Sequence, residues 1–226
     1  IKTISSIIEI SIEDLKRIDL EFENPSSIIQ FDYTLGRYVV GGIDSGSSNY
    51  TYLSGDILRN LGIVHKVYNS KAIANLAAHL KCNLRVSFAT IFKVKANQFV
   101  EQGSFIFHRD SYPVNTFKLI VYLSDVSDEG DGEFSYIKGS HKSYNGLPQF
   151  GNSRNESISS KHLTTIYGKV GDAVLFNVNG YHRGGRCINK DRIVLVVSLT
   201  PSIRGCNGAS DLKFKSIGES EYEILP

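Results

Sequence analysis

A histidine and an aspartate separated by one residue, His108 and Asp110, are the first candidates for chemistry in this chain. They end the segment Phe105–Asp110 (FIFHRD), whose aromatic and β-branched residues predict a strand. Side chains alternate between the two faces of a strand, so the imidazole and the carboxylate would point the same way. Such a pair offers two adjacent ligands to a metal ion, but a single HxD triplet is more often a chance occurrence at a strand end. A metal site therefore needs a third ligand from elsewhere in the chain.

His182 is the best candidate for that third ligand among the six histidines. It follows a turn and a buried-strand pattern, Gly171–Val178 (GDAVLFNV), so it lies at the exit of a predicted strand. Surface or structural roles are expected for the other four: His65, His79, His141 and His162. Two histidines and one carboxylate form the facial triad of non-haem Fe(II) oxygenases, which leaves three coordination positions open.

Arg192 lies ten residues after His182 and begins the next predicted strand, Ile193–Leu199 (IVLVVSL). A 2-oxo acid bound to the metal through two atoms carries a second carboxylate at its far end, and a guanidinium binds such a group through two hydrogen bonds. Without the triad, the same arginine would be interpreted as a solvated residue at the start of a strand. Arg192 is therefore a candidate co-substrate ligand only together with the metal-ligand candidates.

Short strands, separated by Gly, Asn, Asp and Ser, dominate the chain from about Leu84 onward. No helix of convincing length interrupts them, so an antiparallel sandwich, jelly roll or barrel is expected. The clearest helical patterns lie in the first third: a helix capped by Ser11, one over Asp56–Leu61 and one over Ser70–Leu80. The sequence predicts one domain, 1–226, with a helical N-terminal part (1–83), a β-barrel core (84–204) and a C-terminal tail (205–226).

Composition excludes several functional classes. Lys and Arg number 25 and Asp and Glu 23, so no large basic field is available to bind nucleic acid. No apolar run is long enough to span a bilayer, and the first residues lack the pattern of a signal peptide. The chain has three cysteines, Cys82, Cys187 and Cys206, and no CxxC pair. This pattern predicts free thiols and hence a cytoplasmic protein.

Three segments in order carry a family resemblance: FHRD, FKLIVYLSDVSDEGDGEFSYIKGSHKS and GKVGDAVLFNVNGYHRGGRCINKDR. Together they resemble the phytanoyl-CoA dioxygenase-like family of Fe(II)/2-oxoglutarate-dependent oxygenases over about half of the chain, Val86–Ser198. The resemblance implies a mainly β double-stranded β-helix, that is, a jelly-roll or cupin-like barrel with the N-terminal helices packed against it. It also implies Fe(II) on His108, Asp110 and His182, with Arg192 binding the C5 carboxylate of 2-oxoglutarate.

The activity implied by this resemblance is a dioxygenase that uses O2 to hydroxylate a C–H bond of a small-molecule substrate, with succinate and CO2 as co-products. The halogenases of the family have a small residue in place of the carboxylate ligand, so the presence of Asp110 favours hydroxylation or a related oxidation over halogenation. Asn115 is a candidate contact of the co-substrate, although a structural role as an asparagine in a turn is an equally good interpretation. Arg183 and Arg186 would lie near the barrel mouth as candidate substrate ligands, where two solvated turn arginines are also expected.

Two alternatives stay open at this point. A cupin-like metal protein that binds a small molecule or sugar without redox chemistry would use the same triad, but it would have no need of Arg192. A catalytically inactive relative acting as an interaction module is the other alternative, and the intact ligand set argues against it. The sequence indicates neither the substrate nor the oligomeric state.

Overall fold

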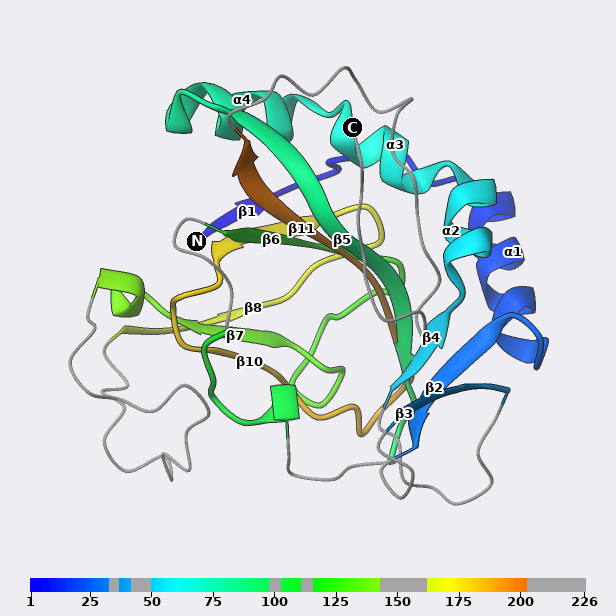
Figure 1. Cartoon of the computed structure of the whole chain (residues 1–226). Helices are drawn as coiled ribbons and strands as arrows, with labels where there is room; N and C mark the ends of the chain where they lie inside the picture. The colour runs from blue at the N-terminus through cyan, green and yellow to red at the C-terminus, as the bar shows by residue number, and fades with distance from the viewer. Residues whose placement is uncertain (33–36, 42–49, 98–102, 111–115, 143–161, 203–226) are drawn as a thin grey trace.

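Two antiparallel sheets form the framework of the computed structural model, which describes residues 1–32, 37–41, 50–97, 103–110, 116–142 and 162–202 (Figure 1). Within these residues, the larger sheet has the strand order β1-β9-β6-β11-β5-β4-β2-β3 and the smaller sheet the order β10-β7-β8. The strands are β1 Lys2–Ile4, β2 Ile28–Asp32, β3 Arg37–Val40, β4 Thr51–Leu53, β5 Asn83–Val94, β6 Phe117–Tyr122, β7 Phe134–Ile137, β8 Leu163–Ile166, β9 Ala173–Asn177, β10 His182–Gly184 and β11 Arg192–Ser202. The expectation of a mainly β protein is confirmed.

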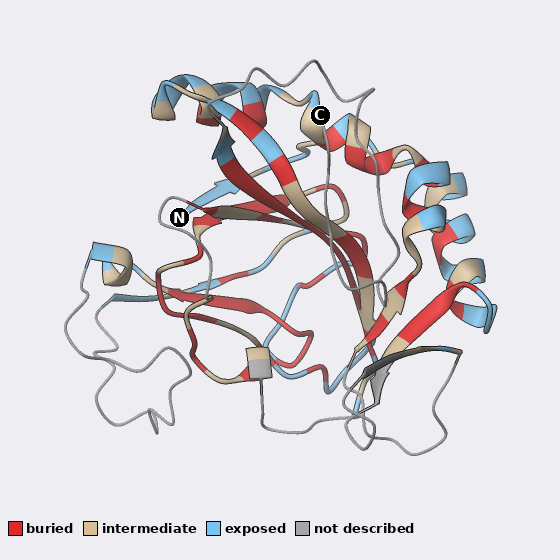
Figure 2. Ribbon diagram, in the orientation of Figure 1, coloured by how far each residue is buried: buried red, intermediate tan, exposed pale blue. Residues whose placement is uncertain are grey.

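Helices cover the outer face of the larger sheet (Figures 1 and 2). In the described part of the chain they are α1 Ile12–Glu23, α2 Gly55–Leu61, α3 Ile63–Tyr68 and α4 Lys71–Leu80, with short 3-10 turns η1 Gly103–Phe105 and η2 Ser140–Lys142. Ser11 caps α1 as predicted, since its hydroxyl accepts the N–H of Asp14 at 3.0 Å. The sequence did not indicate α3, which follows α2 directly after Gly62. No helix among these residues is long and apolar enough to cross a bilayer.

Alternation along the central strands separates two cores. On β6, Leu119 and Val121 pack against the helices, whereas Tyr122 packs in the space between the two sheets. β5 contains a bulge: its pairing with β11 shifts between Ser198 and Leu199, so that one residue of β5 has no partner residue on β11. The larger sheet thus has a face against the helices and a face toward the smaller sheet.

The first third of the chain contains strands as well as the expected helices. β1 pairs with β9 at one edge of the larger sheet, and β4, β2 and β3 extend the other edge beyond β5. These strands have three to five residues, too few for their alternation to be recognised in the sequence. Asn115, the predicted tail 205–226 and Cys206 lie outside the described residues. Cys82 and Cys187 are free thiols, as predicted.

The segment Phe105–Asp110 is not a strand, which corrects the expectation from its residue types. The turn η1 ends at Phe105, and the only β contact in the segment is an isolated antiparallel bridge from His108 to His182. Strand alternation therefore does not explain how His108 and Asp110 come to point the same way. Individual backbone hydrogen bonds to the chain around His182 do so instead.

Candidate metal centre

The backbone holds the three predicted ligands together. The N–H of His108 donates to the carbonyl of His182 at 3.0 Å, and the N–H of His182 donates to the carbonyl of His108 at 3.0 Å. The N–H of Asp110 donates to the carbonyl of Val178 at 3.1 Å, on the chain between β9 and β10. Two segments 68 to 74 residues apart in the sequence are thereby paired, and each brings its ligands to the same point.

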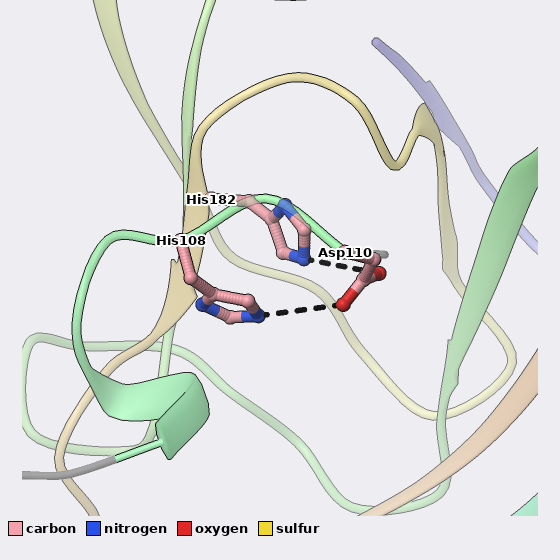
Figure 3. A group of neighbouring side chains, drawn as sticks. All are labelled: His108, Asp110 and His182. Carbon is pink, nitrogen blue, oxygen red and sulfur yellow. Dashed lines mark ion pairs between the residues drawn. The ribbon is translucent and has the colours of Figure 1, made fainter. Parts of the chain in front are cut away.

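The three side chains converge as Figure 3 shows. The Nε2 atom of His108 lies 3.6 Å from Oδ1 of Asp110, and the Nε2 atom of His182 lies 3.7 Å from Oδ2 of Asp110. One ligand atom from each residue lies within 4.8 Å of the others, which is close enough for all three to bind one ion. No other group of this kind occurs among the described residues. The convergence predicted from the sequence is therefore present.

Both imidazoles are oriented by a backbone carbonyl. Nδ1 of His108 lies 2.8 Å from the carbonyl oxygen of Ile106, and Nδ1 of His182 lies 2.8 Å from that of Gly180. A carbonyl oxygen only accepts hydrogen bonds, so each Nδ1 carries the proton and each Nε2 presents a lone pair to the centre of the site. Backbone or carboxylate partners of this kind are typical of metal-binding histidines.

The protonation states also fit a metal ion. Burial lowers the pKa of His108, and burial together with the neighbouring His108 lowers the pKa of His182 to about 3. For Asp110, burial acts to raise the pKa, but the charge of Lys118 and the two imidazoles outweigh it, and the pKa falls below the usual value. Two neutral imidazoles and one ionised carboxylate at neutral pH are the deprotonated donors that a divalent cation needs.

Lys118 is a member of this site that the sequence analysis missed. Its Nζ atom lies 2.8 Å from Oδ2 of Asp110, and both side chains are largely buried. The signal was present in the predicted strand FKLIVYL, where alternation puts Lys118 on the same face as Ile120 and Tyr122. A single lysine on the inward face of an apolar strand indicates a partner of opposite charge within the core.

Arg192 is buried at the start of β11, with 5% of its surface exposed. Its Nη1 donates to the carbonyl of Gly132, in the chain that leads into β7. A Cβ atom added to Gly132 would lie 2.6 Å from Sγ of Cys187 and 2.9 Å from Cδ of Arg192, so only glycine leaves room for the arginine here. The acidic turn before Gly132 is held by Asp131, whose carboxylate accepts the backbone N–H groups of Ser127 and Asp128.

A cavity of about 360 Å³ between the two sheets connects these groups. His108, His182, Lys118 and Arg192 all line it, so the two histidine candidates and the predicted carboxylate-binding arginine share one cavity. The rest of the lining is uncharged and largely aromatic or aliphatic: Tyr50, Tyr52, Phe88, Thr90, Phe92, Ser104, Ile120, Tyr122, Phe134, Phe176, Gly184, Val194 and Val196.

The candidate substrate ligands Arg183 and Arg186 do not line this cavity. The guanidinium of Arg183 lies over the ring of Phe107, 4.6 Å from its centroid, and Arg186 is exposed. Their proposed role in attracting an acidic substrate group stays a prediction. Asn115, the other candidate, is not among the described residues.

Comparison with known proteins adds structural neighbours only. No protein-family model matches the sequence, and no curated protein matches it either. Among solved structures, HygX from Streptomyces hygroscopicus with nickel, 2-oxoglutarate and hygromycin B bound is similar with a TM-score of 0.56 and 16% identity, over 90% of this chain and 83% of that chain.

Two neighbours come from nogalamycin biosynthesis. The non-haem α-ketoglutarate-dependent carbocyclase SnoK has a TM-score of 0.59 and 16% identity, over 99% of this chain and 90% of that chain. The epimerase SnoN, in complex with Fe3+, α-ketoglutarate and nogalamycin RO, has a TM-score of 0.59 and 15% identity, over 99% and 88%. The chain therefore shares its fold with iron- and 2-oxoglutarate-dependent enzymes of differing activity.

Proposed function

We propose that this protein is an Fe(II)- and 2-oxoglutarate-dependent dioxygenase of the phytanoyl-CoA dioxygenase-like family, which hydroxylates a C–H bond of a small molecule. The observation that carries the proposal is the convergence of His108, Asp110 and His182 at a cavity that also contains a buried arginine. When bound, iron and 2-oxoglutarate supply the oxidising power, with succinate and CO2 as co-products. The fold shared with the structural neighbours supports this proposal. The arrangement of the chain as one domain with a jelly-roll barrel is part of the proposal.

Arg192 supports the assignment of 2-oxoglutarate as co-substrate. A Cβ atom built on Gly184 would lie 3.2 Å from Nη2 of Arg192, and Gly184 follows the metal-ligand candidate His182 by two residues on β10. Two residues along a strand span about 6.6–6.8 Å. The guanidinium thus lies against β10 two residues beyond His182, in the cavity that His108 and His182 also line. A metal protein without this co-substrate has no evident need to bury a cation there, which disfavours the non-redox cupin alternative.

A group of aromatic residues in the cavity lining is suited to the substrate. Tyr50, Tyr52 and Phe92 are partly exposed aromatic residues in mutual contact, with ring centroids 5.1 to 5.9 Å apart. These three residues are uncharged, whereas the lysine, the arginine and the imidazoles of the lining are assigned to the metal and co-substrate. We infer that the substrate presents an uncharged ring to these aromatic residues.

Hydroxylation or a related oxidation is proposed over halogenation because Asp110 is present as the third ligand and leaves no additional coordination position for a halide. The protein's own contribution is to orient the co-substrate through Arg192, to hold the metal through the two imidazoles and Asp110, and to surround the site with largely apolar side chains that limit the access of water.

The experiment is anaerobic addition of Fe(II) and then 2-oxoglutarate to the purified protein. A weak visible charge-transfer band is expected, together with one succinate formed per turnover when O2 and a substrate are supplied. The variants Asp110→Ala and Arg192→Ala should lose the band, the first through loss of metal and the second through loss of co-substrate. A metal-loaded wild-type protein that shows no band at saturating 2-oxoglutarate would favour the non-redox alternative.

A further inference from the structure

The geometry points to a positioning role for Lys118: its ammonium occupies one carboxylate oxygen of Asp110, so that Asp110 binds the metal through the other oxygen alone. This inference rests on the proposed metal centre. It assigns to Lys118 the task of keeping a coordination position open for the co-substrate or O2. Lys118 is thus a positioning residue that acts on the metal through Asp110.

The contact between Lys118 and Asp110 is short and largely buried. Nζ of Lys118 lies 2.8 Å from Oδ2 of Asp110, and the exposed fractions of the two side chains are 18% and 13%. Opposite charges at this separation attract strongly, and low solvent access strengthens the attraction. Lys118 reaches Asp110 from β6, in the larger sheet, whereas Asp110 belongs to the segment tied to the smaller sheet. The contact therefore joins the two layers at the metal site.

The two oxygens of Asp110 have different surroundings. Oδ2 has the ammonium of Lys118 at 2.8 Å as well as Nε2 of His182 at 3.7 Å, whereas Oδ1 has Nε2 of His108 at 3.6 Å and no lysine or arginine nitrogen within ion-pair distance among the described residues. A metal ion held by the two Nε2 atoms competes with an ammonium for Oδ2 but not for Oδ1. Binding through Oδ1 alone satisfies both cations at once.

The number of coordination positions explains why this matters. A facial triad with one oxygen from the carboxylate leaves three positions, which a 2-oxo acid bound through two atoms and O2 fill completely. A carboxylate bound through both oxygens would take one of these positions. Removal of the ammonium should therefore permit tighter metal binding, through the second oxygen and the loss of a like charge, at the expense of co-substrate binding.

The test compares Lys118→Met with the wild-type protein loaded with Mn(II), without 2-oxoglutarate. Water-relaxation measurements should show a decrease from about three to about two bound waters on the ion. The affinity for Mn(II), by titration, should rise on the order of 10-fold, and the affinity for 2-oxoglutarate should fall by a similar factor. Lys118→Gln, which is neutral but polar, repeats these measurements if the methionine variant folds poorly.

Two further variants complete the design. Lys118→Arg retains the cation and should restore the wild-type water count. Lys93→Met removes a lysine of the same sheet whose Nζ lies 3.8 Å from Asp19 and over the ring of Phe22, on the helix side, and should change nothing at the metal. An unchanged water count in Lys118→Met, or a weaker Mn(II) affinity, would overturn the inference. Because the Mn(II) readouts need no 2-oxoglutarate, they remain decisive even if the wild-type protein does not bind that co-substrate.

Discussion

His108 and His182 each donate a backbone hydrogen bond to the other, both at 3.0 Å. The backbone therefore sets the spacing of the two imidazoles, whose ring centroids lie 4.3 Å apart. Neither residue can move away without breaking this pair, and each ring is additionally fixed by its own carbonyl partner. A metal ion would meet two ligands that are already oriented, which reduces the ordering required on binding.

Asp110→Ala should abolish tight metal binding. The substitution removes the only anionic member of the triad and leaves Lys118 buried beside two imidazoles, where its charge repels a cation. We expect the affinity for Fe(II) or Co(II) to fall by at least about 100-fold, measured by calorimetric titration under argon. Asp56→Ala on the surface of α2 is the control, and an equal loss there would point to a general effect on folding.

Arg192→Gln should weaken 2-oxoglutarate binding without weakening metal binding. Loss of a charge-assisted contact of about 1.5–3 kcal/mol corresponds to a decrease of roughly 10- to 100-fold in affinity for the co-substrate. The charge-transfer band, titrated with 2-oxoglutarate, measures this change. Arg85→Gln, on the exposed part of β5, serves as the matched control. Equal titration midpoints for the wild-type and Arg192→Gln proteins would remove Arg192 from the co-substrate site.

Gly132→Ala should destabilise the protein more than Gly139→Ala. Both glycines have a similar left-handed backbone, with φ of +85° and +83°, so both substitutions carry the same backbone strain. Only at Gly132 would the added Cβ overlap Cys187 and Arg192, because nothing lies within 4 Å of the corresponding position at Gly139. We expect an additional loss of about 1–3 kcal/mol in the free energy of unfolding, measured with urea. Equal losses in the two variants would show that crowding around Arg192 is unimportant.

The metal-free protein should lose stability as the pH falls below about 6.5. The pKa values of His108 and His182 are lowered from 6.5 in the folded state, the latter to about 3, so the unfolded chain binds more protons in this range. The two histidines contribute fully to stability above pH 6.5. Below this pH, the free energy of unfolding decreases by up to about 1.4 kcal/mol per pH unit for each additional proton that the unfolded chain binds. The lowered pKa of Asp110 adds a further loss from about pH 3.8 downward.

Urea unfolding between pH 5 and pH 7.5 measures this slope. His182→Asn should flatten it by removing one buried titrating group, whereas His79→Asn, on the exposed side of α4, should leave it unchanged. A slope in His182→Asn that equals that of the wild-type protein would show that His182 is not the residue responsible.

The sequence alone determined the features that depend on neighbouring residues. Ser11 was recognisable as a helix cap because the bond that it makes reaches only three residues along the chain. The central strands were recognisable because their β-branched and aromatic runs are long enough to show a pattern. The order of His108, Asp110, His182 and Arg192 was also readable, since a facial triad and a carboxylate-binding arginine require particular residue types.

Only the tertiary structure decided which distant groups meet. The conformation of Phe105–Asp110 follows from the bridge of His108 to His182, and no local propensity could indicate a hydrogen bond across more than 70 residues. The same holds for Lys118. Strand alternation predicts that its side chain lies on the inward face of β6, but its contact with Asp110 depends on how the two sheets pack. Interactions between neighbouring residues thus determine the helices and strands, whereas long-range pairing and burial determine which residues form the site.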